Sequence, residues 1–295
     1  MHDPWLPADF TPVSTVGLVS DTHMPLRLRC WPAGLAEALA GVDLILHAGD
    51  VGDLWVLDEL SQHGPVVAVH GNDETPEAKL GLPLQSIISL AGQRILLWHG
   101  HYPDRIDELT SRTDERLAPK LERLGQRGRR AGARLVVTGH WHIPLIHEVE
   151  GVLIVNPGAL GTGNAISRQL FQTVARLYIG PNGEIAIVHL DLARLDQPHG
   201  LLFDPTLSFS ENAAFYNDTI LAPELQPLVP RFFKEVWAQA PDAMYRISLE
   251  LAWQVWDGDR AEITLADWQA GVRSYAGLSE PVRADLLARL AALAA

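Results

Sequence analysis

Short apolar segments that end in metal-ligand types of side chain dominate the first two thirds of the chain. Residues 16–20 have the pattern of a buried strand, and Asp21 and His23 follow directly. Four later segments with strand character end in the same way. The residues at the five strand ends are Asp21 with His23, Asp50, Asn72, His99, and His140 with His142. Because the carboxyl ends of neighbouring strands in layered α/β folds face one crevice, we expect these side chains to meet.

Two carboxylates, one amide oxygen and four imidazoles in one crevice favour bound cations. Without compensating charge, the crowding and desolvation of so many polar groups is costly. The mixture of donors suits first-row ions such as Mn, Fe, Ni or Zn better than an all-oxygen calcium site. Seven ligands exceed what one tetrahedral ion with an open position takes. The sequence therefore predicts two divalent metal ions that share a carboxylate.

The order of the predicted elements divides the chain in two. Over residues 15–191, strands first alternate with amphipathic stretches, among them one long helix at 102–131, and then form an antiparallel meander. This order favours an α/β fold in which two packed mixed sheets are flanked by helices, a four-layer αββα sandwich. Residues 196–205 read as a boundary, and helical patterns dominate after it. We expect one domain at 1–197 and an all-helical C-terminal extension at 206–295.

The role of the C-terminal extension stays open at this stage. As a lid, it would restrict the size of the substrate. As a docking surface, it would recruit a partner or a second copy of the chain, which would make a homo-oligomer. Nothing in residues 206–295 resembles a known motif.

Composition restricts partners and location. The formal net charge of −13 argues against a broad basic surface for nucleic acid, although bound cations reverse the field locally and allow an anionic substrate. The single cysteine, Cys30, rules out an internal disulfide and favours a reducing compartment. Residues 1–12 contain no apolar signal segment, and no run reaches transmembrane length. We therefore expect a cytoplasmic protein that does not associate with membranes.

The ordered motifs resemble those of calcineurin-like metallophosphoesterases. They are D-x-H at 21–23, G-D at 49–50, G-N at 71–72, H-G at 99–100 and G-H-x-H at 139–142. The short spacing and the Asn-Pro-Gly at 156–158 are similar to the small bacterial and archaeal phosphodiesterase branch. The resemblance implies a first ion bound by Asp21, His23 and His142, and a second bound by Asn72, His99 and His140, with Asp50 bridging.

The resemblance also implies a reaction. Two ions about 3.5–4 Å apart hold a bridging hydroxide and clamp the attacking and leaving oxygens of an in-line displacement. The expected activity is hydrolysis of a small phosphate ester, with nucleotide-derived esters among the candidates and Mn as the favoured ion. Asp50, Asn72 and His99 would take part in catalysis through the metal ions they bind.

One position departs from the superfamily pattern. Many members read G-N-H, with a histidine that assists the leaving group or stabilises the transition state, whereas Asp73 follows Asn72 here. The small phosphodiesterase branch often lacks this histidine too, so the departure favours phosphodiesters. It leaves the general acid open, and His101, two residues beyond a ligand, is a candidate. The arginine of the protein-phosphatase motif G-D-x-x-D-R-G is also missing, since Leu54 stands in its place.

Two alternatives remain beside this hypothesis. One is a phosphomonoesterase or dinucleoside-polyphosphate phosphatase, and the other is a scaffold that keeps the fold without catalysis. Around the predicted ligands, we expect His47 and His70 to pack behind the site and Glu74 to face water.

Overall fold

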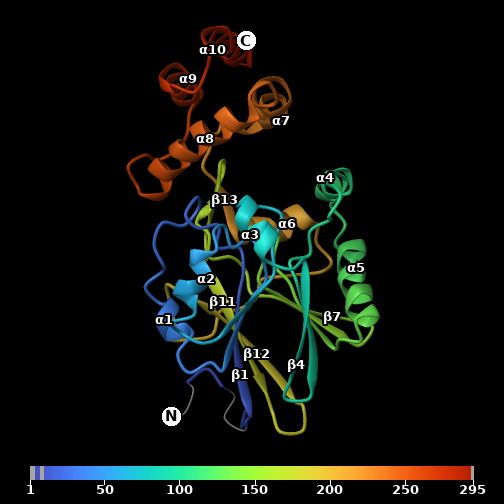
Figure 1. Ribbon diagram of the computed structural model, residues 1–295. Helices are drawn as coiled ribbons and strands as arrows, with labels where there is room; N and C mark the ends of the chain where they lie inside the picture. The colour runs from blue at the N-terminus through green and yellow to red at the C-terminus, as the bar shows by residue number, and fades with distance from the viewer. Residues whose placement is uncertain (1–3, 7–9, 294–295) are drawn as a thin grey trace. The chain divides into compact units, whose positions relative to one another are not determined.

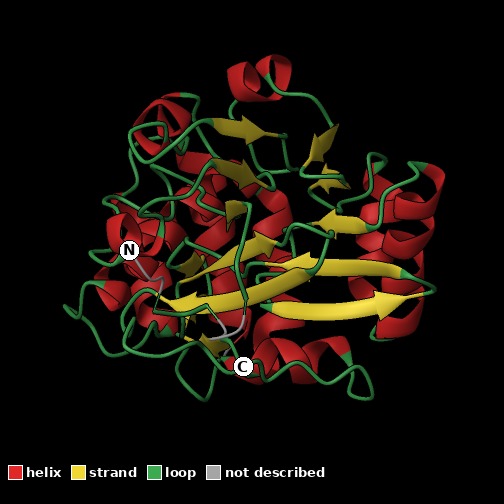
Figure 2. Ribbon diagram, turned by 90° about the horizontal axis from the view of Figure 1, so that it is seen from below, coloured by secondary structure: helices red, strands yellow, loops and turns green. Residues whose placement is uncertain are grey.

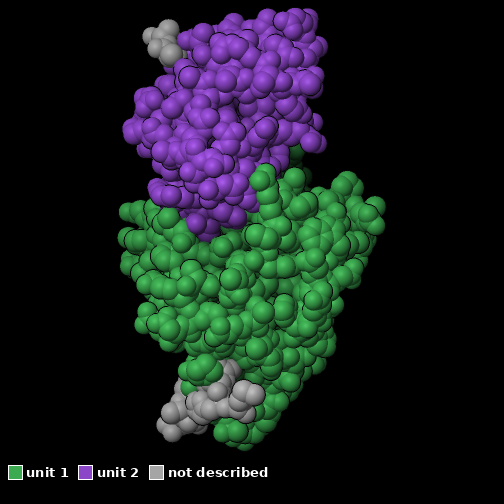
Figure 3. Space-filling view, turned by 90° about the vertical axis from the view of Figure 1, so that its left-hand side faces the viewer, with its two compact units in different colours: residues 1–161, 170–216 green, residues 162–169, 217–295 purple. Residues whose placement is uncertain are grey.

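The computed structural model describes residues 4–6 and 10–293 and forms two compact units. Unit 1 combines residues 1–161 with 170–216, and unit 2 combines residues 162–169 with 217–295 (Figure 3). The chain therefore enters unit 2 briefly at residue 162, returns to unit 1, and enters unit 2 again at residue 217.

The first sheet of unit 1 has the strand order β12-β11-β1-β2-β3. Figure 1 labels β1, β11 and β12 of this sheet. Its strands are β1 (Ser14–Val19), β2 (Leu44–His47), β3 (Val66–Ala68), β11 (Thr173–Ile179) and β12 (Ile185–Asp191). β1, β2 and β3 run parallel, whereas β11 is antiparallel to both β1 and β12. The carboxyl ends of the three parallel strands therefore lie at one edge, where the loops with Asp21, Asp50 and Asn72 begin.

The second sheet has the order β4-β5-β6-β8-β7. Its strands are β4 (Gln85–Leu90), β5 (Gln93–Trp98), β6 (Leu135–Val137), β7 (Leu145–Val149) and β8 (Val152–Asn156). β5, β6 and β8 run parallel, and antiparallel strands β4 and β7 close the two edges. His99 follows β5, and the loop with His140 and His142 follows β6.

The two sheets bury a shared apolar core between them. It contains Leu18, Leu46 and Leu177 from the first sheet and Leu97, Val137 and Val155 from the second. Helices cover the outer faces of the strands (Figure 2). α1 (Leu35–Ala38) and α2 (Trp55–Leu60) lie on the first sheet, and α5 (Leu117–Arg130) lies on the second (Figure 1). Because both faces of each sheet are covered, most residues of inner strands such as β2 and β6 are apolar. The predicted αββα sandwich is confirmed.

The expected single helix at 102–131 is wrong, because two helices occupy this range. They are α4 (Arg105–Thr113) and α5. The side chain of Asp104 caps α4 by accepting from the backbone N–H groups of Ile106 and Asp107. After α4, Asp114 accepts from the Arg116 backbone N–H in a local turn that separates the two helices. Unit 1 also contains α3 (Pro76–Gly81) and α6 (Phe209–Ala214).

Unit 2 is mainly helical, as expected, with one short sheet of order β13-β10-β9. The strands are β9 (Gly163–Asn164), β10 (Ser167–Gln169) and β13 (Asn217–Thr219). The α-helices are α7 (Val229–Arg231), α8 (Pro241–Trp256), α9 (Leu265–Ser274) and α10 (Glu280–Leu293). Short 3-10 helices at Gln226–Leu228 and Trp237–Gln239 and a π-helical segment at Phe232–Val236 flank α7 and lead into α8.

The core of unit 2 is built around Trp268. Its ring stacks on Phe232 with 3.9 Å between ring centroids, and its indole N–H donates to the hydroxyl of Ser248. Thr264 and Asp267 form a capping box that begins α9. None of the helices among the described residues is long and apolar enough to cross a membrane.

The compact units divide the chain at positions other than 197 and 206. Residues 198–216 lie in unit 1, where the Tyr216 hydroxyl accepts from the Leu202 backbone N–H and the Tyr216 carbonyl accepts from Leu170. Residues 162–169 lie in unit 2, because β10 pairs with β13 some 50 residues later. Such long-range pairing leaves no mark in local composition.

Candidate metal centre

The loops that follow the parallel strands of both sheets converge at one place in unit 1. The backbone N–H of Asp21 donates to the carbonyl of Gly49, and that of His23 donates to the carbonyl of Asp50, which ties the β1 loop to the β2 loop. Across the two sheets, His99 Nδ1 lies 2.8 Å from the carbonyl oxygen of Ala48. These bonds fix the loops relative to one another.

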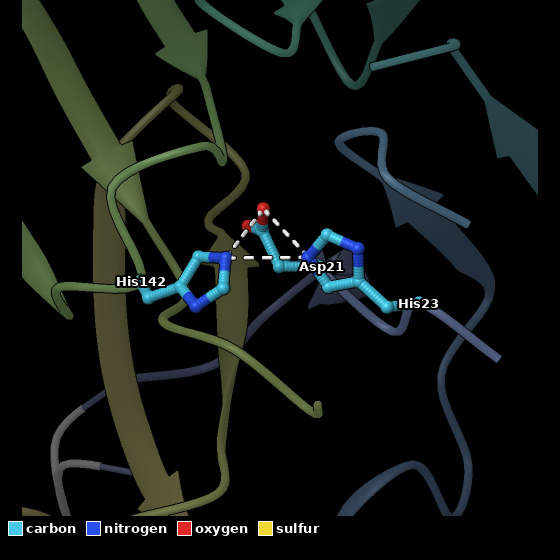
Figure 4. A group of neighbouring side chains, drawn as sticks. All are labelled: Asp21, His23 and His142. Carbon is cyan, nitrogen blue, oxygen red and sulfur yellow. Dashed lines mark hydrogen bonds and ion pairs between the residues drawn. The ribbon is translucent and has the colours of Figure 1, made fainter. Parts of the chain in front are cut away.

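Asp21, His23 and His142 form the first group of side chains with ligand spacing (Figure 4). His142 Nε2 lies 3.3 Å from Asp21 Oδ1 and 3.3 Å from His23 Nε2. The polar atoms of all three point at one another, and Asp21 and His23 are buried. This spacing allows the three atoms to share one metal ion.

Asp21, Asp50 and His99 form a second group directly beside the first. His99 Nε2 lies 3.3 Å from Asp50 Oδ2 and 3.3 Å from Asn72 Oδ1. The same Asp50 oxygen lies 3.6 Å from His23 Nε2 of the first group. Asp50 therefore stands between the two groups, and Asn72 adjoins the second.

His140 lies next to the second group but is bound to a residue that the sequence did not single out. Its ring centroid is 5.1 Å from that of His99, while its Nε2 lies 2.9 Å from Glu108 Oε1. Glu108 is buried on α4 and also accepts from the Tyr102 backbone N–H and from Arg112 Nε. A carboxylate that holds one ring nitrogen of a histidine fixes the tautomer, so the other nitrogen, Nδ1, is left with its lone pair.

Glu108 was not predicted as a site residue, because it falls inside the single long helix expected at 102–131. The only sequence signal nearby is Asp104, whose capping role starts α4 and puts Glu108 at the fourth helical residue. That signal locates the helix and says nothing of the contact with His140.

The buried charges of the site shift several pKa values in a consistent direction. Burial raises the pKa of Asp21, but the neighbouring histidines, His142 above all, together lower it to about 2. Burial likewise opposes ionisation of Asp50, whose pKa is nevertheless held well below its usual range by His99 and His23. Burial lowers the pKa of His99, but the Asp50 and Asp21 carboxylates together raise it to about 9. The field of the two carboxylates thus favours positive charge at this place.

The donor set fits divalent cations of the first transition row. Burial lowers the pKa values of His23 and His140, which favours the neutral imidazole that binds metal ions. Neutral imidazole nitrogens, carboxylate oxygens and an amide oxygen are the mixture that Mn, Fe, Ni and Zn accept.

Strained backbone marks the same residues. Seven non-glycine residues among those described have positive φ, and five of them are predicted ligands. The five are Asp21 (φ 53°), His23 (50°), Asp50 (52°), His140 (73°) and His142 (57°). The other two, Ala91 and Glu150, lie in the turns of the β4–β5 and β7–β8 hairpins. Left-handed non-glycine residues cost about 1–3 kcal/mol each and gather at functional sites, which supports a functional reading of this crevice.

Two glycines of the motifs are required by close approach of the loops. A Cβ on Gly71 would lie 2.0 Å from Asp50 Oδ1, and a Cβ on Gly139 would lie 2.7 Å from Asp21 Oδ2. Both glycines leave room for a carboxylate of the site. At the second of these loops, the His140 backbone N–H also donates to the Asp21 carboxylate.

Glu74 is half-buried and hydrogen-bonded to backbone groups, whereas it was expected to face water. Its carboxylate accepts from the backbone N–H groups of Val51, Gly52 and Gly71 at 3.0, 2.7 and 2.9 Å. It therefore joins the loop that carries Asp50 to the loop that carries Asn72. This role of Glu74 cannot be predicted from the sequence, because its hydrogen-bond partners are backbone groups.

His47 and His70 lie where they were expected. His47 is fully buried behind the site, with its Nε2 2.8 Å from the hydroxyl oxygen of Thr22. His70 Nδ1 lies 2.9 Å from the carbonyl oxygen of Gly71. Neither belongs to the two groups with ligand spacing.

His101 is buried beside the second group, with its ring centroid 5.4 Å from that of His99. Burial, and then the charge of His99 and His140, lower the pKa of His101 to about 3. An imidazole with this pKa is neutral near pH 7 and so lacks the acidic proton that a general acid donates. Its assignment as the general acid stays a prediction.

The sequence is similar to those of known phosphoesterases. Residues 15–179 match the model of the calcineurin-like phosphoesterase superfamily domain. A probable metallophosphoesterase of Methanocaldococcus jannaschii is 35% identical over 146 residues, which are 49% of this chain and 67% of the relative. A phosphodiesterase of the same organism is 23% identical over 160 residues, which are 48% of this chain and 82% of that protein.

A solved structure shares the fold. Vacuolar protein sorting 29 from Cryptosporidium parvum matches with a TM-score of 0.50 and 22% identity, over 65% of this chain and 96% of that one. The family model covers more than half of the sequence, and its range includes every strand end that meets in the crevice. On this evidence, the chain belongs to the calcineurin-like phosphoesterase superfamily.

Proposed function

We propose that this protein is a phosphodiesterase that depends on two divalent metal ions. The observation that carries the proposal is the position of Asp50 Oδ2, which lies 3.6 Å from His23 Nε2 and 3.3 Å from His99 Nε2. One carboxylate between two groups of ligand-type atoms is what a pair of ions with a shared ligand requires.

The seven strand-end side chains divide between the two ions in this proposal. Asp21, His23 and His142 hold the first ion, Asn72, His99 and His140 hold the second, and Asp50 bridges. Such ions supply a nucleophilic water at neutral pH and offset charge on the phosphoryl oxygens. Mn is the ion we favour, and Fe, Ni or Zn suit the same donors.

The residues around these ligands orient them. His99 Nδ1 lies 2.8 Å from the Ala48 carbonyl oxygen, so it donates there and directs Nε2 at Asp50. His140 donates its Nε2 hydrogen to Glu108, so Nδ1 is the nitrogen that would bind the second ion. Glu74 keeps the Asp50 and Asn72 loops together.

Preference for diesters rests on two considerations. The histidine that follows G-N in many superfamily members is replaced by Asp73. A relative from Methanocaldococcus jannaschii carries the name phosphodiesterase. A phosphomonoesterase or dinucleoside-polyphosphate phosphatase, and a scaffold without catalysis, are the alternatives that the experiment must separate.

Hydrolysis of two chromogenic esters tests the proposal. With Mn²⁺, bis-p-nitrophenyl phosphate should be hydrolysed with a higher kcat/KM than p-nitrophenyl phosphate, and chelation should abolish the reaction. Asp50→Asn removes the bridging charge and should lower kcat/KM at least 100-fold. Asp53→Asn, in the same loop but outside both groups, is the matched control and should retain activity.

Each alternative has its own result in this experiment. Faster turnover of the monoester contradicts the diester preference. Absence of metal-dependent hydrolysis in a protein that still binds two ions favours the scaffold.

Location and partners complete the proposal. We place the protein in the cytoplasm, acting on a small phosphate ester, and the exposed free thiol of Cys30 suits a reducing compartment. The C-terminal region serves either as a lid or as a docking surface. As a docking surface, it would bind a partner or a second copy of the chain, which would make a homo-oligomer. We propose no contact with membranes and no broad nucleic-acid surface.

A further inference from the structure

Asp73, which stands where many superfamily members have a histidine, is part of a charged pair at the edge of the site. Its carboxylate forms an ion pair with Arg27 Nη2, and its Oδ2 lies 3.4 Å from His23 Nδ1. Its backbone N–H donates to Asp50 Oδ1 at 2.8 Å. Asp73 is therefore fixed to both groups of candidate ligands by its own main chain and side chain.

Arg27 brings a permanent positive charge to the first group. It lies in the turn after β1, where its backbone N–H donates to the carbonyl of His23. Its side chain is only 15% exposed, and Nη1 lies 3.4 Å from His23 Nε2, the nitrogen that faces Asp21 and His142. The guanidinium contributes to lowering the pKa of His23, after burial.

A guanidinium in this position has an electrostatic consequence. A cation held by Asp21, His23 and His142 would be close to Arg27, and like charges repel. Asp73 offsets part of this repulsion, and it is 38% exposed. An anion that reaches both the ion and Arg27 would offset the remainder. The planar fork of arginine matches the oxygens of a phosphate group, to which it donates paired hydrogen bonds.

We propose that Arg27 binds a phosphoryl oxygen of the substrate and that Asp73 positions its guanidinium. This inference rests on the proposed function and adds a residue that contacts substrate. Arginine keeps its proton at any pH used for assay, so Arg27 stabilises negative charge on the phosphoryl group and transfers no proton. Asp73 acts through Arg27 and is a positioning residue.

Phosphate inhibition and metal content together test the inference. Arg27→Met should retain two Mn ions per chain, measured by elemental analysis. It should weaken inhibition by inorganic phosphate and lower kcat/KM for bis-p-nitrophenyl phosphate about 10- to 100-fold, the range for a lost hydrogen bond to a charged group. Arg27→Lys, which keeps the charge without the fork, should recover part of the loss. Arg29→Met, an exposed arginine in the same loop, is the matched control.

The double variant separates positioning from a general structural effect. Asp73→Asn alone should weaken phosphate inhibition. Added to Arg27→Met, it should weaken phosphate inhibition no further, because the residue through which Asp73 reaches the phosphate is gone. Metal content reports separately any effect of its contact with His23. Additive losses would overturn the positioning role of Asp73.

Failure of this inference and failure of the proposed function give different experimental results. If Arg27→Met binds two ions and is inhibited by phosphate as strongly as Arg29→Met, the inference is overturned and the proposed function stands. Loss of metal from Arg27→Met also overturns it, since Arg27 would then support the ligands rather than the substrate. Wild-type protein that binds no ions overturns the proposed function, and this inference with it.

Discussion

Glu108→Gln offers a sharp test of how the second metal position is built. Three donors converge on the Glu108 carboxylate: Tyr102 N–H on Oε2, and Arg112 Nε and His140 Nε2 on Oε1. A glutamine has one accepting oxygen and one donating amide. Whichever way it is turned, a donor faces a donor, either at Tyr102 or at the pair of Arg112 and His140.

The magnitude follows from these contacts. Loss of a carboxylate that orients a metal-binding histidine typically weakens metal affinity 10- to 100-fold, which corresponds to about 1.4–2.7 kcal/mol. We expect this loss for one of the two ions, because His140 binds the second ion alone in the proposed arrangement. The first ion, held by Asp21, His23 and His142, should bind with unchanged affinity.

Calorimetric titration of metal-free protein with Mn²⁺ measures both affinities. Wild type should show two binding events, and Glu108→Gln should weaken one of them. Glu122→Gln, an exposed carboxylate on the neighbouring helix α5, controls for the loss of one charge. Arg112→Met, which leaves the Glu108–His140 contact in place, should bind both ions within about threefold of wild type. Unchanged affinity for both ions in a folded Glu108→Gln would refute the reasoning.

Two further predictions concern stability. Burial lowers the pKa of His189 to about 4 in the folded protein. Between pH 6.5 and 4 the unfolded chain therefore binds more protons than the folded protein does. The free energy of unfolding should fall by about 3 kcal/mol as the pH drops through that window. His189→Gln should flatten this dependence in urea titrations at pH 7 and 5, and an unaltered slope would count against it. Trp268→Ala removes the ring stacked on Phe232 and should destabilise unit 2 by about 3–5 kcal/mol in urea unfolding. A loss below 1 kcal/mol would contradict the role of Trp268 in that core.

The strand ends were predictable from sequence because two strong local signals coincide there. Buried strands such as β1 and β6 are mostly apolar. An Asp or His directly after such a strand therefore indicates a functional site. The direction of parallel strands then brings the polar ends together. For this reason the αββα sandwich and the meeting of the strand ends could be predicted without coordinates.

Features that depend on long-range or backbone contacts could not be predicted. Glu108 meets His140 across 32 positions, and Glu74 binds backbone groups that every residue possesses. The entry of residues 162–169 into unit 2 depends on pairing with β13. Arg27 and Asp73 are 46 positions apart, and nothing in the sequence distinguishes them from ordinary surface residues. Only the folded structure reveals that they form a pair beside His23.

Anomalous X-ray scattering at the manganese edge, from crystals grown with Mn²⁺, tests the central claim most directly. We predict two peaks per chain, one contacting Asp21, His23 and His142, the other contacting Asn72, His99 and His140, with Asp50 contacting both. A single peak, or peaks at other side chains, would contradict the two-ion centre proposed for this protein.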